Sequence, residues 1–509
     1  MGEATNTVRG VEWPAHAGRP TPVFAHPWVV AGFAVAIGVA IDALALHRPP
    51  GVGVALGLWV VILTAAAIGP LMDLRRPAAV YGFVAAALVL AGFVAVRSSP
   101  VLMMLDVGAA LALVAVISQV RTADDLSRWT LADYTRHPGS LAVEAVTGAA
   151  RFVEVDLRSE LAPERRTRVR AVATGIVIAF PFVAVFTSLF ASADASFQAY
   201  LHDTQSRLAT DALFLRLLWS LAIAAAVAGF WRAARRSASP TPESILRVPH
   251  RRMDPATGAT VLACLVALFG LFEITQVLRR YPELVSPSDF SRNARSGFFQ
   301  LLTVAILVLA VLLLFDWLTR GDDGRRAVTF DRLAVALIAL TAMVMASAMN
   351  RMWLYVKEFG LTELRLYTSV FMVWLGFVLG WFIWTVLRNR QSRFAIGLLA
   401  SGVAVIAGLN LANPDALIVR VNWDRHAAGA EFSEEYVSSL SPDALPVLVD
   451  LVTSGDSRLC TVERELARHR TALVSKQQAQ GVLGDSWSDL QARRALERLP
   501  LDLAQGCGD

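Results

Sequence analysis

The chain has 509 residues, of which 55% are hydrophobic and only 17% charged, and its formal net charge is +5. Soluble proteins of this size usually carry about 25% charged residues, so this composition excludes an ordinary soluble protein and indicates a membrane protein. The basic residues are scattered among the loops and form no single basic face, which argues against nucleic acid as a partner.

The N-terminal residues are polar and contain proline. They lack the short basic region and the small-residue cleavage site of a secretory signal. We therefore expect residues 1–27 to form a cytoplasmic segment and the first apolar run to remain in the protein as a membrane anchor.

Apolar runs of about 20 residues recur along the chain, and their hydrophobicity is continuous, not alternating. Continuous runs predict helices, because lipid offers no partners for exposed backbone groups. The fold class predicted is an all-α, polytopic transmembrane helix bundle with about eleven spans. The spans are expected at 28–46, 52–69, 78–96, 100–120, 171–191, 212–231, 258–276, 297–317, 332–352, 366–387 and 394–410. Residues 28–120 would hold four of these helices and 171–410 the other seven, with a cytoplasmic amphipathic loop at 121–170 between them.

The distribution of basic residues predicts the orientation. Residues 121–170 contain nine Arg and residues 232–252 contain six. The alternate loops hold about one each at 47–51, 97–99 and 192–211, although 277–296 and 353–365 hold four and two. The balance predicts a cytoplasmic N-terminus, and an odd number of spans then places the C-terminus outside the cytoplasm.

The last part of the chain, residues 411–509, is predicted to form a small extracytoplasmic helical domain. It carries ten Lys and Arg against fifteen Asp and Glu, a net charge of −5. Ser433 and Ser441 are predicted N-caps, and two longer amphipathic helices follow them. Cys460 and Cys507 both lie here, and a pair in an oxidising compartment often forms a disulfide. Two reduced thiols in a cytoplasmic tail are the alternative.

Few charged residues fall inside the predicted spans, and such residues are functional candidates by default. Asp316 would lie at the inner end of its span. The others share one depth in the outer third of the bilayer and could surround a pocket that opens outward. They are Asp42, Asp106, Arg216, Glu273 and Arg351.

Further polar residues could complete this outward-facing site. In a helix, Arg351, Tyr355 and Glu358 would share one face, and the preceding outer loop would add Arg292 and Arg295. Arg beside aromatic side chains suits an anionic group such as a phosphate or a carboxylate. The alternative is structural, because charges near helix ends reach the interface at little cost and Trp and Tyr form belts there.

Motifs of the common enzymes are missing from the sequence. We find no HExxH or Cys/His cluster, no GxxxxGK[ST] loop and no GxSxG. The sequence therefore predicts no metal site and no cofactor.

Three stretches together resemble a bacterial membrane family, domain of unknown function 4173. They are "FSRNARSGFFQLLTVAILVLAVLLLF", "ASAMNRMWLYVKEFGLTELRLYTSVFMVWLG" and "NPDALIVRVNWDR" followed by "YVSSLSPDALPVLVDL". The resemblance covers roughly 260–452, with 260–410 as its membrane core, and more loosely the spans before it. It implies a multi-pass cell-membrane protein without implying an activity. The resemblance singles out several residues as candidates but assigns no role to them. These are Arg295, Gly297, Phe298, Arg351, Tyr355, Gly360, Leu361, Thr362, Arg365, Asn413, Pro414 and Asp415.

The sequence leaves three functions open. The first is a non-enzymatic component of the cell envelope that binds, senses or helps to assemble something, with the lipid bilayer and envelope proteins as its partners. The second is a membrane-embedded transferase that acts on a lipid-linked molecule, with Asp42 as the candidate acid. The third is a transporter of a small anion or a proton-coupled solute, in which Glu273 or Asp106 would carry the proton and Arg351 would bind the anion.

Overall fold

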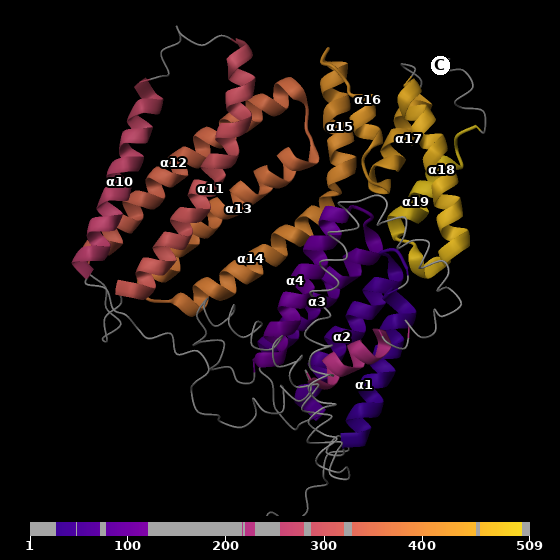
Figure 1. Ribbon diagram of the computed structural model, residues 1–509. Coiled ribbons are helices and arrows are strands. Elements are labelled where there is room, and N and C mark those ends of the chain that lie inside the picture. Colours follow the sequence, from indigo (N-terminus) through magenta and orange to yellow (C-terminus); the bar gives the residue numbers. More distant parts are fainter. Residues whose placement is uncertain are drawn as a thin grey trace, which may run out of the picture.

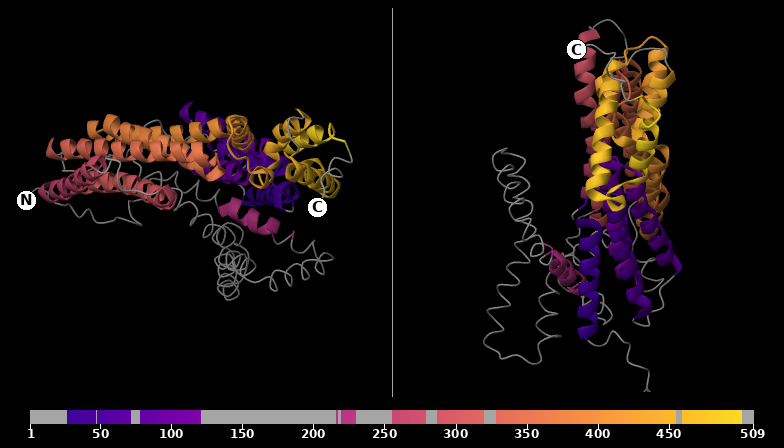
Figure 2. Two further views of the ribbon diagram at one scale, coloured as in Figure 1. Left: turned by 90° about the horizontal axis from the view of Figure 1, so that it is seen from above. Right: turned by 90° about the vertical axis from the view of Figure 1, so that its right-hand side faces the viewer.

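The computed structural model describes residues 27–46, 48–71, 78–120, 216, 219–229, 255–278, 287–319, 328–454 and 459–500. All of the regular elements in these residues are helices, which arrange as two bundles of long helices and a C-terminal domain of shorter ones (Figure 1). Seen from above, the two bundles and the C-terminal domain lie in a row (Figure 2). The all-α class predicted from the apolar runs is confirmed.

The first bundle is formed by the N-terminal helices. These are α1 (Pro27–Ile41), the π-helix η2 (Asp42–Leu46), α2 (Val52–Leu71), α3 (Ala78–Val96) and α4 (Pro100–Gln119). Helices α2, α3 and α4 pack against one another, and their shared core includes the fully buried Ile62, Leu90 and Leu113. Proline at the first position of α4 suits a helix start, because the missing N–H would have no helical partner there.

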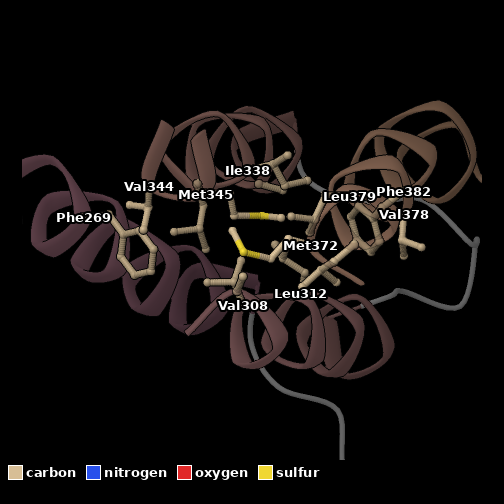
Figure 3. Packing of buried hydrophobic residues seen from close by; sticks show 14 of the residues in the cluster. Phe269, Val308, Leu312, Ile338, Val344, Met345, Met372, Val378, Leu379 and Phe382 are labelled. Carbon is tan, nitrogen blue, oxygen red and sulfur yellow. The ribbon is translucent and has the colours of Figure 1, made fainter. Parts of the chain in front are cut away.

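The second bundle is formed by α10 (Pro255–Leu278), α11 (Pro287–Thr319), α12 (Val328–Phe359) and α13 (Glu363–Thr385). Helix α12 contacts each of the other three. Met345 and Met372 lie at the centre of the buried cluster, among branched and aromatic side chains from all four helices (Figure 3). The core is apolar throughout the part that the figure shows.

Helix α14 (Gln391–Ala412) connects the two bundles (Figure 1). The short 3₁₀-helix η5 (Val386–Arg388) precedes it, and the chain turns at Asn389, which has a left-handed φ of 58°. Helix α14 packs on α13 and also on α3 and α4. A second left-handed residue, Asn413 with φ of 51°, ends α14 and starts the C-terminal domain.

Seven helices in the described part of the chain are long and apolar enough to cross a membrane. Each overlaps one of the predicted spans at 78–96, 100–120, 258–276, 297–317, 332–352, 366–387 and 394–410. The predicted spans 28–46, 52–69 and 212–231 coincide with shorter apolar helices, Val30–Ala45, Val52–Ala67 and Trp219–Gly229. The predicted span 171–191 lies outside the described residues.

In its described residues, 414–454 and 459–500, the C-terminal domain has seven short elements around its own apolar core. They are α15 (Pro414–Ala427), α16 (Glu434–Ser438), η6 (Pro442–Ala444), α17 (Leu445–Ser454), α18 (Cys460–Gln480), η7 (Val482–Gly484) and α19 (Trp487–Leu496). The predicted N-caps are confirmed, because Ser433 and Ser441 each accept a backbone hydrogen bond at the start of a helix. Ile418, Val449 and Val462 are fully buried in the core.

Three connections between membrane helices meet this domain. Val52, at the start of α2, donates its backbone N–H to the Asp485 carbonyl at 3.0 Å. The α3–α4 connection contacts Asp443, and the α12–α13 connection contacts Asn422. The loops 47–51, 97–99 and 353–365, which the sequence places on one side of the membrane together with the tail, therefore gather on one side of the molecule.

Candidate functional site

A buried polar cluster joins the membrane helices to the C-terminal domain. We call it the polar junction. It consists of Arg97, Ser98, Ser99, Asn410, Asp415, Ser441, Asp443 and Ser488. It brings together the start of α4, the end of α14 and the starts of α15, η6 and α19.

Asp443 is the central acceptor of the polar junction. Its Oδ2 accepts hydrogen bonds from the backbone N–H groups of Ser98 at 2.8 Å and Ser99 at 2.9 Å. These groups precede α4, where the positive end of the helix dipole favours a carboxylate. The hydroxyl oxygen of Ser441 lies 3.1 Å from Oδ2, and the hydroxyl of Ser488 donates to Oδ1. Asp443 is 2% exposed. A buried carboxylate of the C-terminal domain thus caps α4, a helix of the first bundle.

Arg97 supplies the positive charge of the junction. Its Nη1 lies 3.5 Å from Asp443 Oδ1, and the side chains of the two residues are 14% and 1% exposed. Its Nε donates to the backbone carbonyl of Asn410 at 2.8 Å. This carbonyl lies in the last turn of α14, where helix carbonyls lack partners and favour a cation. Arg97 therefore stabilises the end of one membrane helix and the carboxylate that caps another.

Asp415 is the second buried carboxyl group of the junction. Its Oδ2 accepts hydrogen bonds from the backbone and the hydroxyl of Ser441, while its Oδ1 is buried without a partner. Burial and, to a smaller extent, the nearby carboxylates of Glu363 and Asp443 raise the pKa of Asp415 to about 6, although the hydrogen bonds from Ser441 act to lower it. Asp415 is thus the member of the junction that changes charge near neutral pH.

A second group of polar contacts fixes the domain at the start of α2. Asp485 forms a two-point pair with Arg493 at 3.0 and 2.6 Å, and Lys476 pairs with Asp489 at 2.7 Å. The backbone of Asp485 approaches Gly51 so closely that a Cβ atom on Gly51 would lie 2.5 Å from the Asp485 carbonyl oxygen. Glycine is therefore required for the contact at this position.

The α12–α13 corner is held by a third group. The side chain of Asn422 accepts from the backbone N–H of Leu361 at 2.7 Å and donates to the Leu361 carbonyl at 2.8 Å. Arg425 donates to the carbonyls of Lys357 and Glu358, and Arg365 donates to the carbonyl of Phe359 at 3.0 Å. Two Arg side chains thus donate hydrogen bonds to the backbone carbonyls in the last turn of α12.

The residues predicted for the outward-facing site lie in separate places. Asp42 and Arg216 are brought together, with Asp42 Oδ2 3.9 Å from Arg216 Nε. Tyr355 and Arg365 are also brought together, since the Arg365 guanidinium lies 4.3 Å from the centre of the Tyr355 ring. Asp106 instead contacts Asn410, whose Nδ2 lies 2.8 Å from Asp106 Oδ1.

The other predicted residues are more dispersed. Glu273 is half-buried in α10, Arg351 is half-buried in α12, and Glu358 is exposed near the end of α12. Arg292 and Arg295 lie in α11, and their side chains are outside the described set. Within the described ranges, no three His, Cys, Asp or Glu side chains are grouped so that they could hold a metal ion.

The polar junction was only partly visible in the sequence. Asp415 was singled out by the family resemblance, and Ser441 was predicted only as a helix N-cap. Arg97 and Asn410 were missed, because one lies in a three-residue connection and the other near the end of an apolar run. The repeated pattern "NPD" and "SPD" is the available signal, since it places an Asp at the second position of two helices.

The cysteines divide between the membrane bundle and the C-terminal domain. Cys264, in α10, is free and exposed. Cys460, at the start of α18, is disulfide-bonded. Cys507, its predicted partner, lies outside the described residues.

An apolar groove lies apart from these polar contacts, on α12, α13 and α14. Its volume is about 480 Å³, and Trp374, Phe377 and Val405 are among its lining residues. Its two hydroxyl groups are used internally, because Ser369 donates to the Arg365 carbonyl and Ser401 to the Leu398 carbonyl. The groove therefore presents an apolar surface on the helices that are long enough to span a membrane.

Comparison with known proteins identifies a family. No curated protein and no solved structure matches the chain. The model of the family described as "Domain of unknown function (DUF4153)" matches residues 84–451. The family number inferred from the sequence motifs, 4173, was therefore wrong, and the match begins at residue 84, among the spans before 260 that the resemblance covered only loosely. It includes Arg97, Asn410, Asp415 and Asp443 of the polar junction, and with more than half of its residues matched, the chain belongs to the DUF4153 family.

Proposed function

We propose that this multi-pass membrane protein is a non-enzymatic component of the cell envelope. Its C-terminal helical domain would be an extracytoplasmic platform that binds another envelope component. The observation that carries the proposal is the Asp443 carboxylate, which caps α4 from the C-terminal domain and pairs with Arg97. Buried contacts of this kind fix the orientation of the domain on the membrane helices, which a binding platform requires.

Two features support the extracytoplasmic placement of this domain. Cys460 is disulfide-bonded, and disulfides persist mainly in oxidising compartments outside the cytoplasm. The domain also contacts three connections that carry few basic residues, as expected of extracytoplasmic loops. A single-cysteine accessibility assay in intact cells, with an impermeant thiol reagent and Arg468→Cys as the labelled position, tests this placement. Labelling only after the membrane is opened would contradict it.

In-cell photocrosslinking tests the binding function. A photoreactive residue would replace Arg468, whose side chain is 71% exposed on α18, in the wild type and in Asp443→Ala. We expect defined crosslinked species in the wild type that are lost in the variant, because the domain is no longer fixed. Accumulation of a lipid-linked intermediate in a deletion strain, together with its turnover by the purified protein, would contradict the proposal and favour the transferase.

Proton-coupled transport is a second candidate, and one observation favours it. Asp106 is a fully buried carboxyl group within a membrane-spanning helix. Such groups are functional candidates by default, and ion and proton pathways are among their known roles. Uptake of radiolabelled solutes in wild-type and Asp106→Asn cells distinguishes the candidates, since a platform predicts equal uptake and a proton-coupled carrier predicts its loss.

A further inference from the structure

A carboxyl group lies within the membrane bundle at Asp106 of α4. It is six residues beyond Pro100, which corresponds to about 9 Å along the helix. Its exposed fraction is 0%. Asp106 Oδ1 accepts a hydrogen bond from Asn410 Nδ2 at 2.8 Å, and the same amide nitrogen donates to the Ile406 carbonyl at 3.0 Å. Both hydrogen atoms of the Asn410 amide are therefore used.

The other oxygen atom of each side chain has no partner. Asp106 Oδ2 and Asn410 Oδ1 are both buried, and no group in the described part of the chain donates a hydrogen bond to either of them. A buried acceptor without a donor costs about 1–3 kcal/mol, and a buried charge without a partner costs more. An ionised Asp106 would incur both costs at this position.

No cation of the neighbouring helices compensates for a charge on Asp106. Helices α2 and α3, which pack on α4, contain no acidic or basic residue. Helix α14 contains only Arg393, in its first turn at the opposite end from Asn410. Arg97 follows α3 and is directed to the Asn410 carbonyl and to Asp443. The described surroundings of Asp106 thus favour an uncharged group.

We propose that Asp106 is a proton-binding site within the membrane. Its Oδ2 carries a proton taken from water, and this O–H group donates a hydrogen bond to Asn410 Oδ1. The acid and the amide then form a cyclic pair in which each donates one hydrogen bond to the other. A single proton satisfies both unpartnered oxygen atoms and removes the buried charge.

The proton-binding site is continuous with the polar junction. Asn410 contacts Asp106 through its side chain and Arg97 through its backbone carbonyl, and Arg97 pairs with Asp443 of the C-terminal domain. A charge on Asp106 therefore acts on Asn410, the residue whose backbone carbonyl accepts the hydrogen bond from Arg97. This inference stands whether the protein is a binding platform or a proton-coupled carrier.

Infrared spectroscopy of the full-length protein in lipid nanodiscs tests the proposal. With ¹³C-labelled aspartate, a protonated Asp106 gives a label-sensitive carboxylic acid C=O band in the wild type that Asp106→Asn lacks. Asp415→Asn serves as the common background, because Asp415 has a pKa of about 6 and contributes an acid band of its own. Asn410→Leu should shift the Asp106 band to higher frequency, because the acid then loses its hydrogen-bond partner.

Two results would overturn the proposal. The first is the lack of an acid band in the wild-type minus Asp106→Asn difference spectrum at every pH from about 5 to about 8, which would show an ionised group. The second is an Asp106 band that Asn410→Leu leaves unmoved, which would show that the cyclic pair does not form. Should Asp106→Asn fail to fold, loss of the labelled band on raising the pH of the Asp415→Asn protein supports the site, and its absence throughout the titration refutes it.

Discussion

The polar junction and the core of the α10–α13 bundle hold the molecule together in different ways. The bundle core is made of apolar side chains around Met345 and Met372 (Figure 3). In a bilayer such contacts gain little from the hydrophobic effect, because lipid is as apolar as the side chains, and shape complementarity contributes most. The junction instead contains buried charges whose partners come from distant parts of the chain, so that one missing partner leaves another group unsatisfied.

This difference predicts where single substitutions have the largest effect. In the junction, truncating one side chain leaves its partners buried without a hydrogen bond or an opposite charge, so that nothing offsets the free-energy cost of their desolvation. In the bundle core, truncation costs only the lost packing and the cavity that it leaves. Each comparison below pairs a residue with a control of the same type.

Asp443→Ala should have the largest effect. It removes the acceptor of the Ser98 and Ser99 N–H groups and leaves Arg97 without its carboxylate. Breaking a buried pair costs about 3–5 kcal/mol. We expect early thermal unfolding in detergent and rapid proteolysis of the C-terminal domain. The control is Asp450→Ala, since Asp450 is 66% exposed in its pair with Arg498 and should change little. Equal effects of the two substitutions would show that the junction does not hold the domain.

Met372→Ala should have the next largest effect. Met372 is 2% exposed at the centre of the bundle core, and truncation of such a residue costs about 2–5 kcal/mol. Met343→Ala is the control, because Met343 is 52% exposed on the outer surface of α12. Thermal unfolding in detergent should show a marked decrease for the first variant and almost none for the second. A Met372→Ala effect as large as that of Asp443→Ala would remove the distinction between the two regions.

The pH dependence of stability sharpens the comparison further. The folded-state pKa of Asp415, about 6, is above its ordinary value of 3.8. The folded protein therefore binds a proton that the unfolded chain releases, and stability should fall as the pH rises from about 4 to about 6. The loss is on the order of 2–3 kcal/mol for a shift of this size. Asp415→Asn should flatten this part of the curve of unfolding midpoint against pH, and an unchanged curve would assign the dependence to another group.

The sequence could predict the bundle better than the junction, and the reason is physical. Apolar runs report membrane depth wherever the helix packs, so seven predicted spans coincide with long apolar helices. Helix caps are also local, and Ser433 and Ser441 were predicted from a few neighbouring residues. The contact of Arg97 with Asp443 joins residues 346 positions apart, and no local pattern contains it.

The predicted outward-facing site shows the same limit. Depth along the chain could place Asp42, Asp106 and Arg351 at one level, but it contains no information about the position of a residue around the bundle. The structure pairs Asp42 with Arg216 and Asp106 with Asn410, on different sets of helices. Lateral position depends on which helices are neighbours, and a single sequence does not state it.

Gly360→Ala should destabilise the protein less than Asp443→Ala or Met372→Ala, and it tests the corner between the two regions. Gly360 has a φ of +80°, and a Cβ atom would lie 2.6 Å from Asn422 Oδ1 and 2.8 Å from an Arg425 nitrogen. Gly429→Ala is the matched control, because Gly429 has a φ of +92° with open space around it. Both variants carry the backbone strain of about 1 kcal/mol, but only Gly360→Ala also disturbs the Asn422 hydrogen bonds, for a total of about 2–3 kcal/mol. Hydrogen exchange at Leu361 should increase in Gly360→Ala alone. Equal exchange in both variants would mean that the α12–α13 corner is held by the backbone conformation and not by Asn422.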